Sequence, residues 1–426
     1  MNANTNTPPR GMRDILPDEM RLRSAALTVI INTYEKFGFT QIETPAVEEL
    51  SLLLKDTGSE NTKLIFSILK RGEELKKAFD MKIALSDLGL RYDLTVPLAR
   101  YFSLNHSKLP SVFKSIQIGP VWRAERPQKG RFRQFYQCDI DIIGETSFWS
   151  ELELINASSK ALLNLGINDF IIQINDRRLL SALMSFCGFP EDQLTNILIS
   201  LDKLDKIGIE GVKKELHEYP VDQRSIEQLI KVITTNYDAD NNSLKELQET
   251  LYPHIEPQVI DELCILIEQI NSTSDALYKC IFNPTLVRGM GYYTGPIFEI
   301  TYKNYPFSIA GGGRYDKMIG QLSNKEVPAC GISLGFERLI GILTEEQLLK
   351  LPQLETIALL YDKEIEPKIL ASTINNIRKS NQYITIYKKQ KNFSKQLNNL
   401  LTNGISRYMV VNMDNTISAI KEIKEI

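Results

Sequence analysis

Cysteine and histidine are scarce in this sequence, and neither is grouped. The 426 residues include five cysteines and three histidines. No two cysteines form a CxxC pair, and no HExxH sequence occurs. An odd number of scattered cysteines argues against a disulfide framework and against a cysteine-ligated zinc site. We therefore expect neither a zinc centre nor catalysis by histidine.

Long apolar runs are also missing. The longest are far shorter than the roughly 20 residues that a membrane-spanning helix needs. The N-terminal segment, MNANTNTPPRGMRD, has no apolar core of the kind found in signal peptides. These features predict a cytoplasmic protein that makes no membrane contact.

Two common nucleotide-binding signatures are absent as well. No GxxxxGK[ST] sequence occurs, which excludes a P-loop. Gly289, Gly291 and Gly295 form GxGxxxG, which is one residue too long for the dinucleotide fingerprint. The run Gly311–Gly313, taken alone, is best interpreted as a structural turn.

The overall composition is that of an ordinary globular protein, with 43% apolar residues, 24% charged residues and a net charge of −3. The length predicts two or three domains. The charge is uneven, because residues 355–426 contain 11 Lys and Arg against 7 Asp and Glu. A basic C-terminal segment on an acidic body fits a polyanionic partner.

The residue pattern predicts an α+β fold in four segments. Residues 1–174 and 285–350 are rich in strand-like runs, whereas residues 175–284 are polar and helix-rich. The middle segment therefore has the character of a helical insertion in one larger domain. In residues 351–426 strand-like and helical runs alternate, which predicts a small α/β domain with a parallel or mixed sheet.

The densest group of cations lies in the segment 122–144. Five cations and a single acid, Glu125, lie between Trp122 and Gln134. Pro127 and Gly130 place these cations on a turn between two extended runs. A solvated charged face is the simplest interpretation of an isolated charge run, but this turn also suits a polyanion.

The second run of that segment alternates strictly. Cys138, Ile140 and Ile142 are predicted to point to one face of a strand, and Gln137, Asp139 and Asp141 to the other. A polar strand face beside a cationic turn can hold a small polar substrate next to a polyanion.

Isolated arginines in extended or helix-start settings occur at Arg123, Arg288, Arg314 and Arg338. Arg338 lies in the first turn of a predicted helix that begins near Phe336, where free N–H groups and the helix dipole favour an anion. Each arginine alone could be a surface or ion-pair residue. Three arginines converging on a triphosphate account for the set most economically.

The motifs that contain these residues closely resemble those of class II aminoacyl-tRNA synthetases, and specifically histidine–tRNA ligases. In chain order they are RGMRDILP (10–17), a predicted helix and strand (18–44) that end at Pro45, LRYDLTVPLARY (90–101), WRAERPQKGRFRQFYQCDIDIIG (122–144), LVRGMGYYTGPIFE (286–299), GGGRYD (311–316) and GISLGFERL (331–339). The resemblance implies a class II catalytic domain, an antiparallel sheet flanked by helices, with a helical insertion. It also implies a C-terminal anticodon-binding-like domain and a homodimer formed through the segment ending at Pro45.

The activity implied by the resemblance is ATP-dependent ligation of histidine to tRNA(His) through a histidyl-adenylate, with Mg²⁺ and an unspecified number of metal ions. In this family pattern Arg123 grips the α-phosphate and Arg338 the far end of a bent ATP. Arg288 lies close to both the α-phosphate and the histidine carboxylate, so Arg288 and Arg123 are the catalytic residues. Glu125 orients the adenine or a metal.

The resemblance also implies the remaining contacts. Asp93, Thr95 and Gln137 hold the α-amino group of histidine. The imidazole pocket and the loop that meets the tRNA acceptor end follow from the same motifs: Asp141, Tyr292 and Tyr293 form the pocket, and Arg126 and Gln128 belong to the loop.

Three features depart from the family pattern. Gly291 replaces the usual Asp beside the catalytic arginine. Asp141 replaces the commoner Glu and is one methylene shorter. The chain ends at Ile426 without the last helix of the usual anticodon-binding domain, which predicts a shortened C-terminal domain.

Two alternatives remain. One is the regulatory subunit of ATP phosphoribosyltransferase, which shares the fold but typically loses the ATP-binding arginines and the anticodon domain. Retention of Arg123, Gln128, Arg131, Arg288 and Arg338 argues against it, whereas the short C-terminus favours it. The other is a histidine- or RNA-binding sensor without chemistry, which the intact ATP residues disfavour.

Overall fold

The chain forms two compact units, Met1–Leu349 and Lys350–Ile426. The computed structural model describes residues 6–424 except 56–60, 127–129, 236–240, 288–291, 324–325, 352–355, 380–382 and 413–415. Within these described ranges, no helix is both long and apolar enough to cross a membrane.

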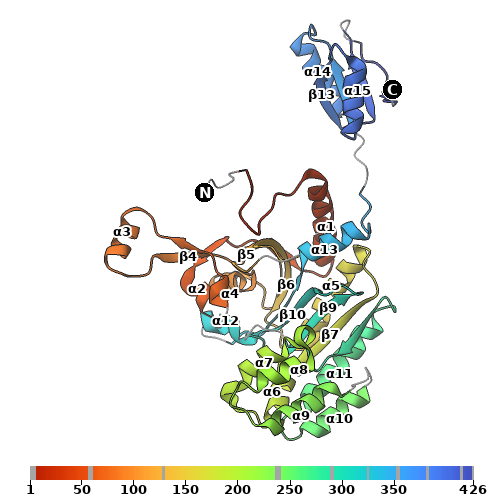
Figure 1. Cartoon of the computed structure of the whole chain (residues 1–426). Coiled ribbons are helices and arrows are strands. Elements are labelled where there is room, and N and C mark those ends of the chain that lie inside the picture. Colours follow the sequence, from red (N-terminus) through yellow and green to blue (C-terminus); the bar gives the residue numbers. More distant parts are fainter. Residues whose placement is uncertain are drawn as a thin grey trace. The chain divides into compact units, whose positions relative to one another are not determined.

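The first unit is built on an eight-stranded sheet whose inner strands are all antiparallel neighbours (Figure 1). Only the outermost pairs, β1 with β5 and β7 with β8, are parallel. In spatial order the strands are β1 (Thr40–Ile42), β5 (Phe113–Trp122), β6 (Gln134–Ile143), β11 (Ala329–Leu334), β10 (Ser308–Arg314), β9 (Pro296–Tyr302), β7 (Phe170–Asp176) and β8 (Tyr278–Phe282). The predicted antiparallel sheet flanked by helices is confirmed.

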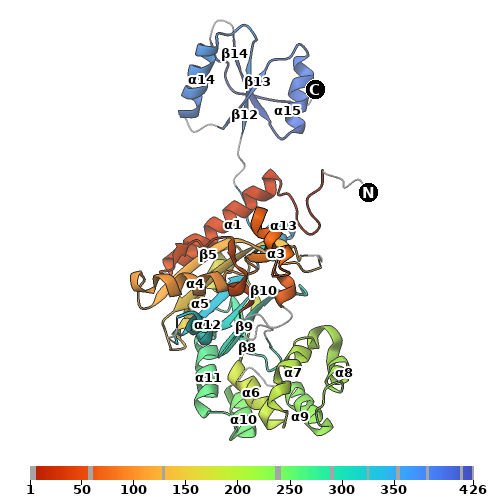
Figure 2. The same ribbon diagram turned by 90° about the vertical axis from the view of Figure 1, so that its left-hand side faces the viewer.

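One face of this sheet is covered by α1 (Pro17–Lys36), α5 (Trp149–Asn164) and α13 (Phe336–Glu345). The three helices share a continuous apolar core with Cys138, Ile140 and Ile142 of β6. Figure 2 shows α1 and α5 running along the sheet. The helix predicted at 18–36 is confirmed, with Pro17 at its first turn, where the missing N–H of proline does no harm.

A second, smaller core lies on the other face. Here α4 (Thr95–Asn105) and α12 (Asp316–Ser323) pack together against Phe113 and Ile143. Helix α4 begins at Thr95, two residues before Pro97. Proline in the first turn loses no helical hydrogen bond, so the helix starts upstream of it.

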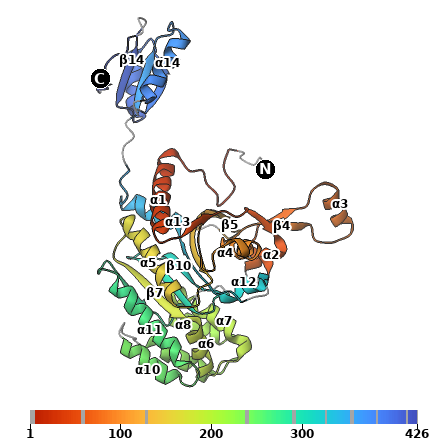
Figure 3. The same cartoon turned by 180° about the vertical axis from the view of Figure 1, so that it is seen from behind.

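A small sheet and two helices precede this core. The strands β2 (Val47–Glu49), β4 (Ser86–Leu90) and β3 (Ser67–Leu69) pair in that order, and α2 (Leu50–Leu54) packs against β4. Helix α3 (Gly72–Asp80) projects from the first unit beyond the strands β3 and β4 (Figure 3).

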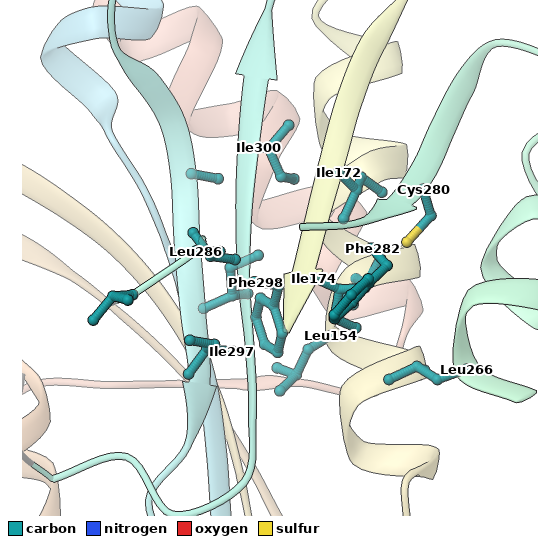
Figure 4. Packing of buried hydrophobic residues seen from close by; sticks show 14 of the residues in the cluster. Leu154, Ile172, Ile174, Leu266, Cys280, Phe282, Leu286, Ile297, Phe298 and Ile300 are labelled. Carbon is teal, nitrogen blue, oxygen red and sulfur yellow. The ribbon is translucent and has the colours of Figure 1, made fainter. Parts of the chain in front are cut away.

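A group of helices leaves the sheet after β7 and returns to it at β8. They are α6 (Arg177–Phe186), α7 (Leu194–Leu201), α8 (Leu204–Leu216), α9 (Gln223–Thr234), α10 (Asn241–Leu251) and α11 (Pro257–Ser272). Because β7 and β8 are paired neighbours, the whole group is an excursion between adjacent strands. Figure 4 shows α5 and α11 supplying Leu154 and Leu266 to the core beneath these strands, next to Phe298 of β9.

The turn predicted at Gly311–Gly313 is wrong, because these residues form the middle of β10. Their small size is needed between strands. A Cβ atom at Gly312 would lie 2.0 Å from the carbonyl oxygen of Gly331 on β11. Glycine therefore serves close approach of the backbones here and not a reversal of the chain.

The second unit is a four-stranded mixed sheet, as the alternation of strand-like and helical runs predicts. The strand order is β13 (Ile384–Lys388), β12 (Ile357–Tyr361), β14 (Arg407–Val411) and β15 (Lys421–Glu422). The first three strands are parallel and β15 is antiparallel. Helices α14 (Pro367–Lys379) and α15 (Phe393–Thr402) connect the parallel strands, and apolar clusters form on both sheet faces.

Candidate active site

The polar side chains of β6 lie on the sheet face opposite the main core. Gln137 Nε2 lies 3.4 and 3.5 Å from the two carboxylate oxygens of Asp139, which requires both side chains to share a face. Asp139 and Asp141 are nonetheless buried, at 5% and 3% exposure. The predicted alternation is confirmed. The polar face of β6, called the floor below, is however buried and not exposed to solvent.

Asp93 and Gln137 present free acceptors to this floor. Asp93 Oδ1 accepts the Val96 N–H at 3.2 Å and so caps α4, at whose first residue Thr95 lies. Within the described residues the Ser115 hydroxyl, opposite Asp141 on β5, has no hydrogen-bond partner, and neither do two buried acceptors, Asp93 Oδ2 and Gln137 Oε1. A buried acceptor without a donor is costly, and an ammonium group carries three donors that would satisfy both atoms.

Asp141 is held by a tyrosine to which sequence reasoning assigned no role. The Tyr315 hydroxyl donates to Asp141 Oδ1 at 2.6 Å. The Tyr292 ring lies edge-on to Tyr315 at 6.1 Å between centroids and 4.7 Å from Tyr293. The structure therefore brings Asp141, Tyr292 and Tyr293 into one aromatic-lined group, as the motifs suggested.

The neighbouring strand leaves room for this carboxylate. Gly331 pairs with Asp141 across β11 and β6. A Cβ atom at Gly331 would lie only 1.9 Å from Asp141 Oδ1. Glycine at position 331 therefore leaves the space that the Asp141 carboxylate occupies.

The three buried acids of the pocket resist ionisation. Burial raises the pKa of Asp93 to about 6 and that of Asp141 to about 7. Burial, with Asp141 nearby, also raises the pKa of Asp139 well above its ordinary value. Arg123 lowers the pKa values of Asp93 and Asp139 without offsetting the burial. Binding of a cationic ligand would lower these pKa values and so favour the charged carboxylates.

The raised pKa of Asp141 predicts a pH-dependent stability difference for Asp141→Asn. The folded-state pKa, about 7, exceeds the ordinary 3.8, so between these values the folded chain binds more protons than the unfolded chain. The free energy of unfolding then falls as pH rises through this window. Because asparagine does not ionise, the free energy of unfolding of the unliganded variant should exceed that of the parent by on the order of 3 kcal/mol at pH 8.

Thermal unfolding between pH 4 and pH 8 measures this difference. The two chains should unfold at nearly the same temperature at pH 4 and diverge steadily up to pH 7. The same substitution at the exposed Asp87 is the control. A difference that does not change with pH would contradict the proposed cause.

The cationic turn lies where β5 ends and β6 begins. Arg123 Nε donates to the Tyr92 carbonyl at 3.0 Å, and its guanidinium stacks 5.1 Å from the Phe135 ring. Glu125 lies 3.7 Å from Arg131, and Arg126 is exposed. Arg123 is thus held at the end of the sheet where Gln137 lies, while Arg126 projects into solvent.

Arg338 is held at the same end of the sheet. It follows Phe336 and Glu337 in the first turn of α13. Its guanidinium donates to the Ser308 carbonyl at 2.6 Å and stacks 5.1 Å from Phe307. Because β6 pairs with β11 and β11 pairs with β10, both antiparallel, the structure places Arg123 and Arg338 at the same end of this group of strands.

Arg314 does not belong to this group. It forms a two-pronged ion pair with the fully buried Glu151 of α5, at 2.6 and 2.8 Å. Of the four isolated arginines, Arg314 is therefore an ion-pair residue, which is the other interpretation that its sequence setting allowed. Its partner lies 163 positions away, so no local signal reveals the pair.

Three predicted positions, Arg288, Gln128 and Gly291, lie outside the described residues. The residues that sequence reasoning missed are Asp139 and Tyr315. The alternation of β6 already places Asp139 on the polar face, whereas nothing local links Tyr315 to Asp141.

The part of the sequence that forms the sheet, the acidic floor and the two arginines matches one family model. A sequence model of histidyl-tRNA synthetase matches residues 11–339. This chain belongs to the histidyl-tRNA synthetase family. The match covers the floor residues of β6, Tyr315 and both arginines.

Curated relatives in this family match over nearly their full length. The chain is 42% identical over 423 residues to the histidine–tRNA ligase of Leifsonia xyli subsp. xyli, covering 97% of this chain and 96% of that relative. It is 35% identical over 405 residues to the histidine–tRNA ligase of Christiangramia forsetii, covering 91% and 88%.

Solved structures agree on the fold. The histidyl-tRNA synthetase of Nostoc sp. PCC 7120 superposes with a TM-score of 0.76 at 26% identity, covering 98% of this chain and 97% of that one. A Bacillus halodurans structure, titled as an ATP phosphoribosyltransferase regulatory subunit/histidyl-tRNA synthetase, gives a TM-score of 0.75 at 19% identity. The latter likeness concerns the fold alone, so the fold does not separate the ligase from the regulatory subunit.

Proposed function

We propose that this chain ligates histidine to tRNA(His) with ATP, through a histidyl-adenylate. The observation that carries the proposal is the pair of buried acceptors without donors, Asp93 Oδ2 and Gln137 Oε1, beside the Asp141–Tyr315 pair. Two acceptors suit an ammonium, and an acid flanked by aromatic rings suits an imidazole. Free histidine carries both groups, an α-ammonium and an imidazole.

In this proposal the floor of β6 binds the amino acid. ATP binds at the end of the sheet where Arg123 and Arg338 lie. Asp93, Thr95 and Gln137 bind the α-amino group, and Asp141, Tyr292 and Tyr293 read the imidazole. Arg123 and Arg288 stabilise the charge that builds on the α-phosphate when the histidine carboxylate attacks it. The remaining ATP contacts are Arg338 at the far phosphates and Glu125 near the adenine or a metal.

Mg²⁺ is proposed to accompany ATP. In the ranges that the structure describes, no group of three or more His, Cys, Asp or Glu side chains could hold a metal ion. The proposed ion is carried mainly by triphosphate oxygens, which Mg²⁺ prefers together with water and one or two carboxylates. Glu125 is the carboxylate at hand; the ion would supply charge neutralisation to the phosphates.

The tRNA and the partner subunit are part of the same proposal. Arg126 and Gln128 are expected to meet the acceptor end. Residues 1–174 and 285–350 would form the catalytic domain, 175–284 a helical insertion, and 351–426 a shortened anticodon-binding domain. The segment ending at Pro45 would form a homodimer interface, and the protein would act in the cytoplasm.

Pyrophosphate exchange tests the first step directly. With Mg²⁺ supplied, the purified chain should exchange labelled pyrophosphate into ATP only when histidine is present, because exchange requires reversible adenylate formation. Histidine lacking its amino group, imidazolepropionate, is the matched control and should not support exchange. No exchange at all would favour the regulatory-subunit or sensor alternatives, and exchange that does not require histidine would contradict the assignment of histidine as the substrate.

A further inference from the structure

Glu337, the residue before Arg338, joins four separate parts of the first unit. Its carboxylate accepts two hydrogen bonds from Arg23 of α1, at 2.7 and 2.8 Å. It also accepts the backbone N–H of Tyr136 on β6 at 3.3 Å and a bond from Arg13 at 3.3 Å. The N-terminal segment, α1, β6 and α13 therefore meet at one carboxylate.

This contact is buried and geometrically restrictive. The side chains of Arg23 and Glu337 are only 5% and 8% exposed. The Arg23 guanidinium also contacts two adjoining rings, 5.4 Å from Tyr136 and 4.9 Å from Phe336. Burial opposes ionisation of Glu337, but the bonds from Arg23 lower its pKa below the ordinary value. A bidentate ion pair of this kind fixes the relative orientation of the two side chains as well as their distance.

The N-terminal segment, through Gly11 and Arg13, contacts the same region around Glu337. Gly11 accepts the Arg133 N–H at 2.7 Å through its carbonyl oxygen. Arg13 forms a two-pronged pair with Glu19, at 2.6 and 2.7 Å, and stacks 4.9 Å from Phe132. This segment thus ties the cationic turn to the start of α1 beside Glu337.

The contact lies between the two arginines proposed for ATP. Glu337 is bonded to the start of β6, which pairs with the strand leading to Arg123. On its other side it is adjacent to Arg338 in the first turn of α13. The bonds of Glu337 to Arg23 and to the Tyr136 N–H thus link the first turn of α13, which carries Arg338, to α1 and β6.

We propose that Glu337 is a positioning residue for ATP, which holds the first turn of α13 through Arg23 and the Tyr136 N–H so that Arg338 reaches the far phosphates. The inference rests on the proposed function. It predicts that loss of the contact weakens binding of the triphosphate and leaves binding of AMP, which lacks the far phosphates, intact.

The test compares ATP and AMP affinities by titration calorimetry for the full chain, Glu337→Gln and Arg23→Lys. Glu337→Gln keeps the shape of the side chain and removes its charge; Arg23→Lys keeps the charge and removes the two-pronged geometry. Each variant should bind ATP about tenfold more weakly and should bind AMP with an affinity within about twofold of the parent. This is the effect expected when the contact of Arg338 with the far phosphates is displaced and not removed.

A second arginine–glutamate pair, in which the Glu48 side chain is 6% and the Arg100 side chain 30% exposed, supplies the control. Arg100 and Glu48 form the same two-pronged geometry at 2.7 Å for both bonds, away from α13. Glu48→Gln should lower the unfolding temperature comparably without changing the ratio of ATP to AMP affinity. If Glu48→Gln changes that ratio equally, the effect is general destabilisation and the inference is wrong.

A double variant separates positioning from direct contact. If Glu337 acts through Arg338, Glu337→Gln should weaken ATP no further once Arg338→Ala is present. Independent, additive losses, or equal losses for ATP and AMP, would overturn the inference. A parent chain that binds no ATP would instead contradict the proposed function.

Discussion

Replacing Asp141 with alanine is expected to lower kcat/KM for histidine about 1,000-fold while changing the KM for ATP less than about threefold. The carboxylate is buried on the floor of the pocket and already accepts the Tyr315 hydroxyl. Its other oxygen, Oδ2, is the one proposed to meet the imidazole. Truncation removes that contact and also leaves the Tyr315 hydroxyl without its acceptor, so both the substrate and the pocket are affected.

Pyrophosphate exchange at varied histidine and varied ATP separates the two constants. Asp141→Asn tests the charge alone, because its amide oxygen can still accept from Tyr315, and it should retain more activity than alanine. Asp80→Ala, at an exposed position on α3, is the control. Equal losses for histidine and ATP would contradict the assignment of Asp141 to the imidazole.

Replacing Arg123 with alanine is expected to slow adenylate formation by about 100- to 1,000-fold, the usual effect of deleting one group that stabilises developing charge. The Arg123 guanidinium is already oriented, because its Nε is bonded to the Tyr92 carbonyl and its plane rests on Phe135. No reorganisation is then needed as charge builds on the α-phosphate. Histidine itself should bind within about threefold of the parent, because the floor of β6 is untouched.

Single-turnover formation of the adenylate, followed by rapid quench, measures the rate, and calorimetry measures histidine binding. Lys76→Ala, an exposed cation on α3, shows whether loss of any positive charge has the same effect. An unchanged rate in Arg123→Ala, or a loss of histidine affinity as large as the loss of rate, would refute the role given to Arg123.

Much of the architecture follows from local patterns. The helix at 18–36 and the alternation of β6 are periodic signals that neighbouring residues carry by themselves. The mixed sheet of the second unit follows in the same way from alternating strand-like and helical runs. Such predictions succeed because 3.6- and 2-residue periods reflect which side of an element is buried.

The glycines at 311–313 show where local reasoning fails. Glycine is typical both of turns and of strands whose backbones approach closely, and the sequence around it does not separate the two. The decisive fact is the carbonyl oxygen of Gly331, 2.0 Å from where a Cβ atom would lie. That neighbour comes from another strand, and a linear pattern contains no information about it.

By itself, the sequence determined the polar face of β6, the cationic turn and the set of arginines, because each depends on residue types and short spacings. Only the tertiary structure decided what these groups do with one another. It paired Arg314 with Glu151, joined Tyr315 to Asp141 across 174 positions and bound Glu337 to Arg23 across 314. The physical reason is that a buried charge or hydroxyl must find a partner wherever the fold supplies one, and the fold brings distant segments together without leaving a signal in either of them.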